Sequence, residues 1–278
     1  NNVKIITDIG SYDLMGKPAE EFPAIPETDQ RVDAGIDASV LNEMISTVSF
    51  AVSKDDLKPA LTGVYFKFEK DTLTAVATDG HRLAKYVRSD FKAGQFQGEV
   101  IIPRKFLNII TAYISNDETA QLWLGDSVFT ATVGGDTIYT RIIEERFPDY
   151  QSVIPTDNEK EIRVDCNNLL SAVKRVSIFS NKTTRQIAIR AVSGSATITT
   201  EDPEKASKAQ ETIDIEYAGD SIDVGYNAAY LKDILAHMNS NEIVIKFNTP
   251  ISAGLFYPTS FSDNAQITML LMPIRLND

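Results

Sequence analysis

The stretch Ala77-Thr78-Asp79-Gly80-His81-Arg82-Leu83-Ala84 joins two runs of residues that alternate in the manner of β-strands. Leu73-Thr74-Ala75-Val76-Ala77 precedes it and Leu83-Ala84-Lys85-Tyr86-Val87 overlaps its end, so Asp79-Gly80 falls where a tight turn requires a positive φ. The simple interpretation is a hairpin corner, because Asp-Gly is a common turn pair. The alternative is a catalytic or ligand-binding role for His81.

The scarcity of histidine and cysteine argues against catalysis or metal binding at His81. The other histidine of the 278 residues is His237 and the single cysteine is Cys166, so the sequence has no zinc-site spacing. It also has neither a Gly-x-x-x-x-Gly-Lys-Ser/Thr phosphate loop nor a Gly-x-Ser-x-Gly nucleophile elbow. We therefore expect no catalytic residue, no metal and no cofactor.

The composition is that of a globular protein of two ordinary domains, with 43% hydrophobic and 24% charged residues. No apolar run approaches the roughly 20 residues that a membrane helix needs, so no membrane partner is expected. One cysteine excludes an internal disulfide framework, which fits a cytoplasmic location and predicts a structural role for Cys166. Because Asn1-Asn2-Val3 is neither an initiator nor a signal peptide, we expect the chain to be truncated upstream.

The sequence contains a long internal repeat. Phe22-Pro23 recurs as Phe147-Pro148, 125 residues later, and Val32-Asp33 recurs as Val164-Asp165, 132 residues later. A period of this length is too long for a solenoid unit and suits a duplicated domain. The natural protein is expected to have three such units. The predicted division is 1–30 for the tail of a first domain plus a linker, 31–155 for a middle domain and 156–278 for a C-terminal domain.

Each complete unit is predicted to be α+β, with two helices and about eight strands. Leu41, Met44 and Val48 have helical spacing, and an N-cap is expected near Asp37 or Ser39. The predicted helices are 38–54, 103–115, 167–185 and 226–240. The predicted strands of the first complete unit are 63–69, 73–78, 83–88, 99–102, 120–124, 127–133 and 137–144, and those of the second lie between 186 and 224 and then up to Leu276.

Charge is distributed unevenly along the chain. The net charge of −12 argues at first against a nucleic-acid partner, because phosphate binding depends on Lys and Arg. Yet the four predicted helices hold eight basic residues and two acidic ones: Lys54, Arg104, Lys105, Lys174, Arg175, Lys182, Arg185 and Lys232 against Glu43 and Asp233. Helix surfaces often carry such residues for solubility alone. If the helices share one face, they form a positive track for a phosphate backbone, without sequence-specific readout.

Three stretches together resemble the signature of the bacterial replicative sliding clamps, the beta subunits of DNA polymerase III. They are Ala77 to Ala84, then Arg146-Phe147-Pro148-Asp149-Tyr150 with Val153-Ile154-Pro155, and Leu271-Met272-Pro273-Ile274-Arg275-Leu276, in the order and spacing of that family. The likeness extends from about Arg31 to Leu276. It implies repeated DNA-clamp domains, each with two helices on the inner face and antiparallel sheets outside.

The resemblance also implies a function and partners. Such a protein is a non-catalytic processivity factor that encircles duplex DNA and forms a head-to-tail dimer when its first domain is present. Polymerase and clamp-loader subunits insert short linear peptides into a cleft between the second and third domains. The matching positions are Leu61, Thr78, Gly80, His81, Arg82, Leu83, Pro148 and Val153, with Leu270, Met272, Pro273, Ile274 and Arg275 from the last strand. Ser152 stands where some relatives carry arginine, which puts polar contacts at that edge in doubt.

Two further sets of residues receive roles. The resemblance places Ile178 and Phe179 at the dimer interface, whereas the charge distribution predicts that Arg104, Lys105, Lys174, Arg175, Lys182 and Arg185 face DNA. Two other classes of protein stay open on the residues alone. One is a hydrolase or transferase that uses carboxylate pairs, although none of the Asp or Glu residues lies in a recognisable motif. The other is an extracellular β-rich adhesin, against which the absence of disulfides counts.

Overall fold

The computed structural model describes residues 2–22, 33–92, 96–114 and 119–276. The chain divides into two compact units, Asn1–Arg31 and Val32–Asp278. The small unit holds the antiparallel hairpin of β1 (Asn2–Thr7) and β2 (Gly10–Met15), followed by the short 3-10 helix η1 (Ala19–Glu21). The predicted linker and the repeat positions Pro23 and Val32 lie outside the described residues.

The first half of the large unit has the predicted α+β order. Its elements are β3 (Asp33–Asp37), α1 (Ala38–Val48), η2 (Ser49–Ala51), η3 (Pro59–Leu61), β4 (Gly63–Phe68), β5 (Leu73–Thr78), β6 (Arg82–Arg88), β7 (Gly98–Pro103), α2 (Arg104–Tyr113), β8 (Thr119–Leu124), β9 (Val128–Val133) and β10 (Asp136–Arg141). The predicted end of the second helix, Ser115, lies outside the described residues.

The second half repeats this order. Its elements are β11 (Lys160–Asp165), α3 (Cys166–Val176), η4 (Ser177–Phe179), β12 (Gln186–Val192), β13 (Ser195–Asp202), η5 (Pro203–Lys205), β14 (Ser207–Asp214), β15 (Ile222–Asn227), α4 (Ala228–Ala236), β16 (Glu242–Phe247), β17 (Gly254–Pro258) and β18 (Ala265–Leu271). Within the described residues each half therefore has two α-helices and eight strands, which confirms the duplicated α+β fold. None of these helices is long and apolar enough to cross a membrane.

Each of the four helices ends before its predicted last residue. The carboxylate of Asp37 accepts a hydrogen bond from the Ser39 amide at 2.8 Å, which confirms the expected N-cap of α1. Helix α3 ends at Val176, well before the predicted residue 185. Beyond η4, the Asn181 side chain accepts hydrogen bonds from the amides of Thr183 and Thr184, so the chain turns there instead of continuing as a helix.

The two halves are joined by one continuous sheet of eight strands, in the order β11-β16-β17-β18-β6-β5-β4-β7. At the junction β18 pairs antiparallel with β6, in a register that runs from Ala265 opposite Arg88 to Leu271 opposite Arg82. Each half adds a four-stranded sheet, β10-β9-β8-β3 in the first and β14-β13-β12-β15 in the second. Since backbone pairing crosses the predicted boundary between the halves, the division at residue 155 stays a prediction.

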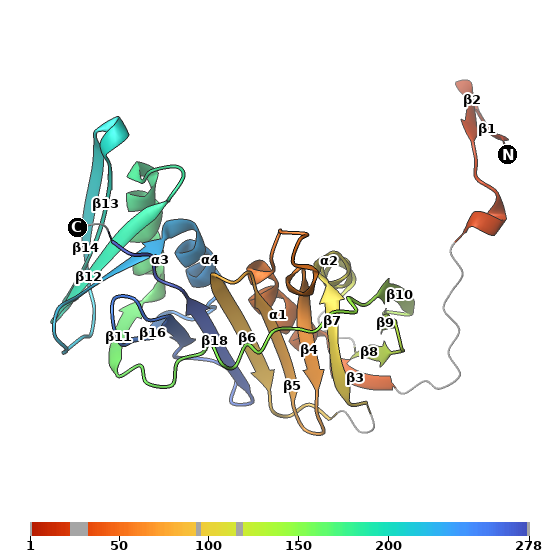
Figure 1. Ribbon diagram of the computed structural model, residues 1–278. Coiled ribbons are helices and arrows are strands. Elements are labelled where there is room, and N and C mark those ends of the chain that lie inside the picture. Colours follow the sequence, from red (N-terminus) through yellow and green to blue (C-terminus); the bar gives the residue numbers. More distant parts are fainter. Residues whose placement is uncertain (1, 23–32, 93–95, 115–118, 277–278) are drawn as a thin grey trace. The chain divides into compact units, whose positions relative to one another are not determined.

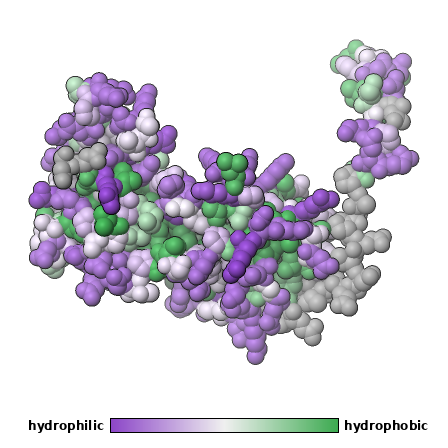
Figure 2. Space-filling model, in the orientation of Figure 1, coloured by the Kyte–Doolittle hydropathy of each residue, from purple (hydrophilic) through white to green (hydrophobic). Residues whose placement is uncertain are grey.

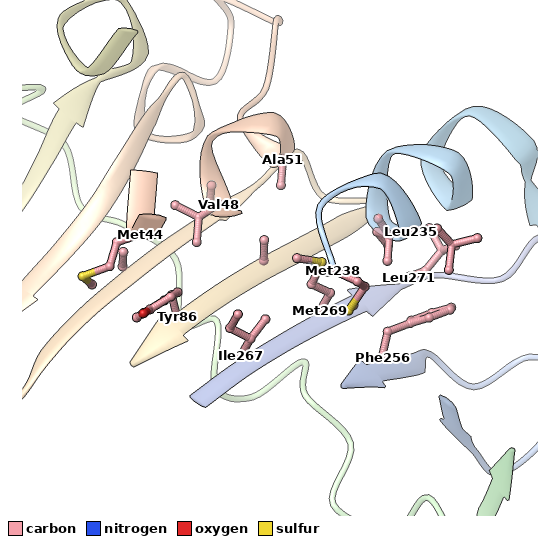
Figure 3. Close-up of a cluster of buried hydrophobic side chains, with 14 of the residues drawn as sticks. Met44, Val48, Ala51, Tyr86, Leu235, Met238, Phe256, Ile267, Met269 and Leu271 are labelled. Carbon is pink, nitrogen blue, oxygen red and sulfur yellow. The ribbon is translucent and has the colours of Figure 1, made fainter. Parts of the chain in front are cut away.

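Helices cover one face of the eight-stranded sheet. In Figure 1 the four α-helices lie on the same side of it, and α1 packs on β5 and β6, α2 on β7 and α4 on β18. Figure 3 shows how the core crosses the junction: Met44 and Val48 of α1 and Met238 after α4 point at the face that carries Tyr86 and Met269. On the view in Figure 2, hydrophilic side chains predominate and hydrophobic ones gather in small patches.

The opposite face of the sheet has an apolar cluster of its own. Successive side chains of a strand point to opposite faces, so Leu83 and Leu270 turn away from the helices while their neighbours turn toward them. This cluster contains Tyr65, Val76, Leu83, Ile101, Phe147, Ala253, Leu255 and Leu270, with Leu61, Ile143, Tyr150 and Ile154 packed against it. The segment after β10 therefore covers the part of this face next to the junction.

Candidate functional site

A cavity of about 340 Å³ opens beside the junction of β6 and β18. Leu83 and Leu270 stand opposite each other in the strand register, and both line it. The full lining is Leu61, Thr78, Gly80, His81, Arg82, Leu83, Pro148, Asp149, Tyr150, Val153, Leu270 and Met272. Ten of the thirteen residues predicted for a partner cleft are therefore brought together, from both halves of the repeat. We call this cavity the junction cleft.

The predicted turn at Asp79-Gly80 forms one wall of the junction cleft. Gly80 has a φ of 90°, a conformation that glycine adopts without strain. The carboxylate of Asp79 accepts hydrogen bonds from the amides of His81 and Arg82, at 2.9 and 3.1 Å. The Thr78 hydroxyl donates to the Arg82 carbonyl at 2.7 Å. These side chains hold the turn in a single shape, with open space over Gly80.

Aromatic rings build the wall contributed by the segment after β10. Tyr65 stacks on Phe147 with ring centroids 4.9 Å apart and lies 6.0 Å from Tyr150. Burial raises the pKa of Tyr65, and its hydroxyl donates a hydrogen bond to Glu99 at 2.6 Å. Sequence reasoning missed Asp149 and Tyr150 as lining residues, although both belong to the stretch from Arg146 to Tyr150 that carried the resemblance.

The last strand ends earlier than predicted. Strand β18 ends at Leu271, so Met272 to Arg275 do not belong to the last strand as predicted. Pro273 has no amide hydrogen to continue the ladder. On either side of it the Met272 amide donates to His81 and the Ile274 amide to Gly225, each at 2.9 Å. Met272, 43% exposed, stands at the rim, whereas Pro273, Ile274 and Arg275 do not line the cleft.

The predicted DNA-facing cations fall in two places. Arg104 and Lys105 begin α2, and Lys174 and Arg175 lie in the last turn of α3, with Lys182 and Arg185 in the turn beyond it. Arg175 is not a free cation, because its guanidinium donates two hydrogen bonds to Glu211, at 2.8 and 2.7 Å. This pairing lowers the pKa of Glu211. Among the described residues, the other five make no ion pair within 4.0 Å.

The predicted interface residues are exposed. Ile178 and Phe179 form η4 with 76% and 44% of their surfaces accessible. They lie beside β14, whose Ser207 hydroxyl donates a hydrogen bond to the Phe179 carbonyl at 3.1 Å. Strand β14 is an edge strand that pairs with β13 alone among the described strands. In the part of the chain that the structure describes, no His, Cys, Asp and Glu residues cluster as a metal site would need.

Comparison with known proteins places both halves in one family. Residues 35–149 match the family model of the DNA polymerase III beta subunit, central domain, and residues 151–275 match that of its C-terminal domain. The Beta sliding clamp of Pseudomonas putida is 30% identical over 266 residues, which cover 95% of this chain and 71% of the relative. That of Vibrio cholerae is 26% identical over 277 residues, covering 99% and 74%.

Solved structures agree. The crystal structure of the DNA polymerase sliding clamp from Pseudomonas aeruginosa with ligand matches with a TM-score of 0.90 at 28% identity, covering 99% of this chain and 74% of that one. A DnaN sliding clamp from Bartonella birtlesii bound to griselimycin matches with a TM-score of 0.90 at 26% identity and the same coverage. The chain therefore belongs to the DNA polymerase III beta subunit family, the beta sliding clamps, which are non-catalytic processivity factors.

Proposed function

We propose that the junction cleft is where this clamp holds polymerases and other replication proteins, through short linear peptides, while its helices face duplex DNA. The observation that carries the proposal is an apolar cleft built from both halves of the repeat. Leu83, Leu270 and Tyr150 offer an apolar lining for leucine or aromatic anchors, and Met272 at the rim can adapt its flexible side chain to several partners. The same proposal puts the protein in the cytoplasm, where duplex DNA is found.

The DNA-facing role draws its support from the arrangement of charge. The four helices share one side of the eight-stranded sheet, and Lys105, Lys174 and Lys182 are exposed cations on or beside them without an ion-pair partner among the described residues. The chain as a whole carries a net charge of −12. A positive strip on an otherwise acidic protein attracts a phosphate backbone locally and repels it elsewhere.

The repeat supports the proposal of self-association. Strand β6 has the same place in the first half as β14 in the second, and β10 corresponds to β18. Because β18 pairs with β6 inside the chain, the free edge of β14 is suited to a strand of the β18 type from a neighbouring subunit. Ile178 and Phe179 add exposed apolar surface beside that edge. A head-to-tail dimer that uses the neighbour's first domain is therefore proposed.

A pair of exposed residues gives the sharpest test of the cleft. Leu83 is a poor choice, because it is 1% exposed and its truncation removes core packing. Met272 and Val153, 43% and 55% exposed, line the rim without such a role. The double variant Met272→Ala, Val153→Ala should bind griselimycin and a short linear polymerase peptide more weakly, by about 1 to 3 kcal/mol in total, because each change removes apolar contact area at the rim. Isothermal titration calorimetry measures both ligands.

A matched control separates the cleft from apolar surface in general. Ile251 is 64% exposed and does not line the junction cleft, so Ile251→Ala should leave both affinities unchanged. Equal affinities for the parent and the rim double variant would mean that these ligands bind elsewhere.

A further inference from the structure

Arg82 lines the junction cleft through its position in the chain, but its guanidinium points to the helix side. The residue is 7% exposed. Its Nε donates to Asp79 at 3.1 Å, its Nη1 to Asp233 of α4 at 2.6 Å and its Nη2 to the Phe50 carbonyl of η2 at 3.0 Å. Arg82 and Asp233 are 151 residues apart in sequence and belong to different halves of the repeat. One guanidinium thus joins the cleft-forming turn to both halves.

Aromatic rings enclose this guanidinium. The Arg82 Cζ lies 5.2 Å from the centroid of Phe50 and 4.7 Å from that of Tyr230 on α4, within the range of cation–π attraction. Phe50 in turn stacks on His237 at 4.3 Å, and His81 stacks on Tyr230 at 5.7 Å. Rings from η2 and α4 therefore fix the plane of the guanidinium from both halves of the repeat.

The partners of Arg82 also shape the wall of the junction cleft. The Asp79 carboxylate accepts a hydrogen bond from the Arg82 Nε, and it also accepts hydrogen bonds from the backbone amides of His81 and Arg82 that hold the turn. The backbone carbonyl of His81, the residue before Arg82, accepts a hydrogen bond from the Met272 amide and so anchors the start of the C-terminal segment. Displacing Arg82 would release Asp79 and His81 together. A cleft wall that is already in its binding shape loses less entropy when a ligand orders it.

We infer that Arg82 is a positioning residue of the junction cleft: by holding the Asp79 turn against α4 through Asp233, it keeps the wall in its ligand-binding shape. Its guanidinium does not serve as a contact for the ligand. This inference rests on the proposed role of the cleft and adds how that cleft is held. Lysine cannot replace arginine here, because the three nitrogens of the planar guanidinium each donate to a different acceptor, and lysine has a single nitrogen.

Asp233 makes the inference testable, because it is half-exposed and does not line the junction cleft. In the 278-residue chain, Asp233→Ala should weaken griselimycin binding on the order of 5- to 20-fold, as should Arg82→Ala. The double variant should have the same affinity as the single variant that binds more weakly, because both changes break the ion pair between Arg82 and Asp233. Arg82→Lys should fall between the parent and Arg82→Ala. Glu211→Ala removes an ion-pair partner of α3 outside the cleft lining and should change nothing.

The two variants distinguish a positioning role of Arg82 from a direct contact with the ligand. If Arg82→Ala weakens binding while Asp233→Ala does not, the guanidinium contacts the ligand directly and the inference is overturned. Unchanged affinity in both variants also overturns it. Amide hydrogen exchange provides a second readout without ligand: Asp233→Ala should speed exchange at the amides of Gly80 to Arg82 and leave β12 and β13 unchanged. If the parent binds neither griselimycin nor polymerase peptide, the proposed cleft function fails, and exchange alone still decides whether Arg82 holds the turn.

Discussion

Cys166 is a buried residue whose chemistry is set by its surroundings. It lies at the start of α3, and its thiol donates a weak hydrogen bond to the Leu235 carbonyl at 3.4 Å. Burial raises the pKa of the Cys166 thiol to about 11, and the nearby charge of Asp165 adds to this. The thiolate is the nucleophilic form, so a thiol with this pKa is inert near neutral pH. The structural role predicted from the single cysteine is consistent with this burial.

We expect Cys166 to react with a disulfide reagent at pH 8 at least about tenfold more slowly in the native chain than in urea. In the native chain the reagent cannot reach the buried thiol, and little of the thiol is ionised. The pKa is raised in the folded state, so the stability that this thiol contributes is fully present below its ordinary value of 9.0 and is lost as the pH rises toward 11. Absorbance at 412 nm follows the reaction. Rapid stoichiometric modification of the native chain would contradict the assignment.

The strand position of Arg82 could be predicted from the sequence, whereas its partners could not. The Asp79-Gly80 turn and the alternation of β6 were readable from the sequence, and alternation alone puts Arg82 on the face opposite Leu83. The assignment of Arg82 to the cleft came from the motif, which carries no direction for the side chain. Its partner Asp233 is 151 residues away, and no local pattern announces a contact at that separation.

Helices and strands were predictable because their signals are local. Each of β5 and α1 follows from the spacing of its apolar residues, and the cap of α1 follows from Asp37. Helix ends were less predictable, since the turn after η4 depends on the Asn181 side chain, and an isolated asparagine is compatible with several structures. The end of β18 at Leu271 was predicted wrongly, although Pro273, a residue that breaks a strand ladder, was a local signal for it.

The N-cap of α3 is a measurable contribution of one element. The Asp165 carboxylate accepts the Asn168 amide at 2.7 Å. We expect Asp165→Ala to lower the free energy of unfolding by about 1 kcal/mol, because an amide of the first turn then loses its protein acceptor. Asparagine caps as well as aspartate, so Asp165→Asn should remain close to the parent. Urea denaturation followed by circular dichroism gives the values, and equal losses in both variants would argue that charge matters and not the cap.

The repeat was predictable from the sequence, whereas the strand pairing that joins the two halves was not. Matching residues such as Phe22 and Phe147 reveal the period, and the family resemblance gave the domain type. The pairing of β18 with β6 is a contact between distant segments, and register of this kind is set by packing on both faces. Family membership also removes the hydrolase interpretation that the acidic composition had left open.

Duplex binding should depend on the unpaired Lys174 of α3 more than on the paired Arg175. Each phosphate neutralised adds about 0.9 to the slope of log affinity against log salt. We expect Lys174→Ala to reduce that slope by about 0.9, equally for unrelated duplexes. Arg175→Ala should reduce it less, because Glu211 already holds that guanidinium. Fluorescence anisotropy at low salt measures the slope, where surface charges act most strongly.

Lys70 offers a control for this experiment. It is exposed in the turn between β4 and β5, outside the helices. Its replacement by alanine should leave the slope unaltered. A Lys174 variant with the slope of the parent would remove this part of α3 from the DNA-facing surface.

The free edge of β14 is a potential site of aggregation in a chain that is not part of the proposed dimer. An exposed strand edge templates indiscriminate sheet growth, and the aggregates that result are hard to reverse. Along β14 the outward positions hold Lys208, Gln210, Thr212 and Asp214, so the edge is hydrophilic and varied in charge. Fibril-like stacking of identical copies would set like charges against each other. The proposed dimer can therefore use this strand, whose hydrophilic edge disfavours sheet growth between unassembled chains.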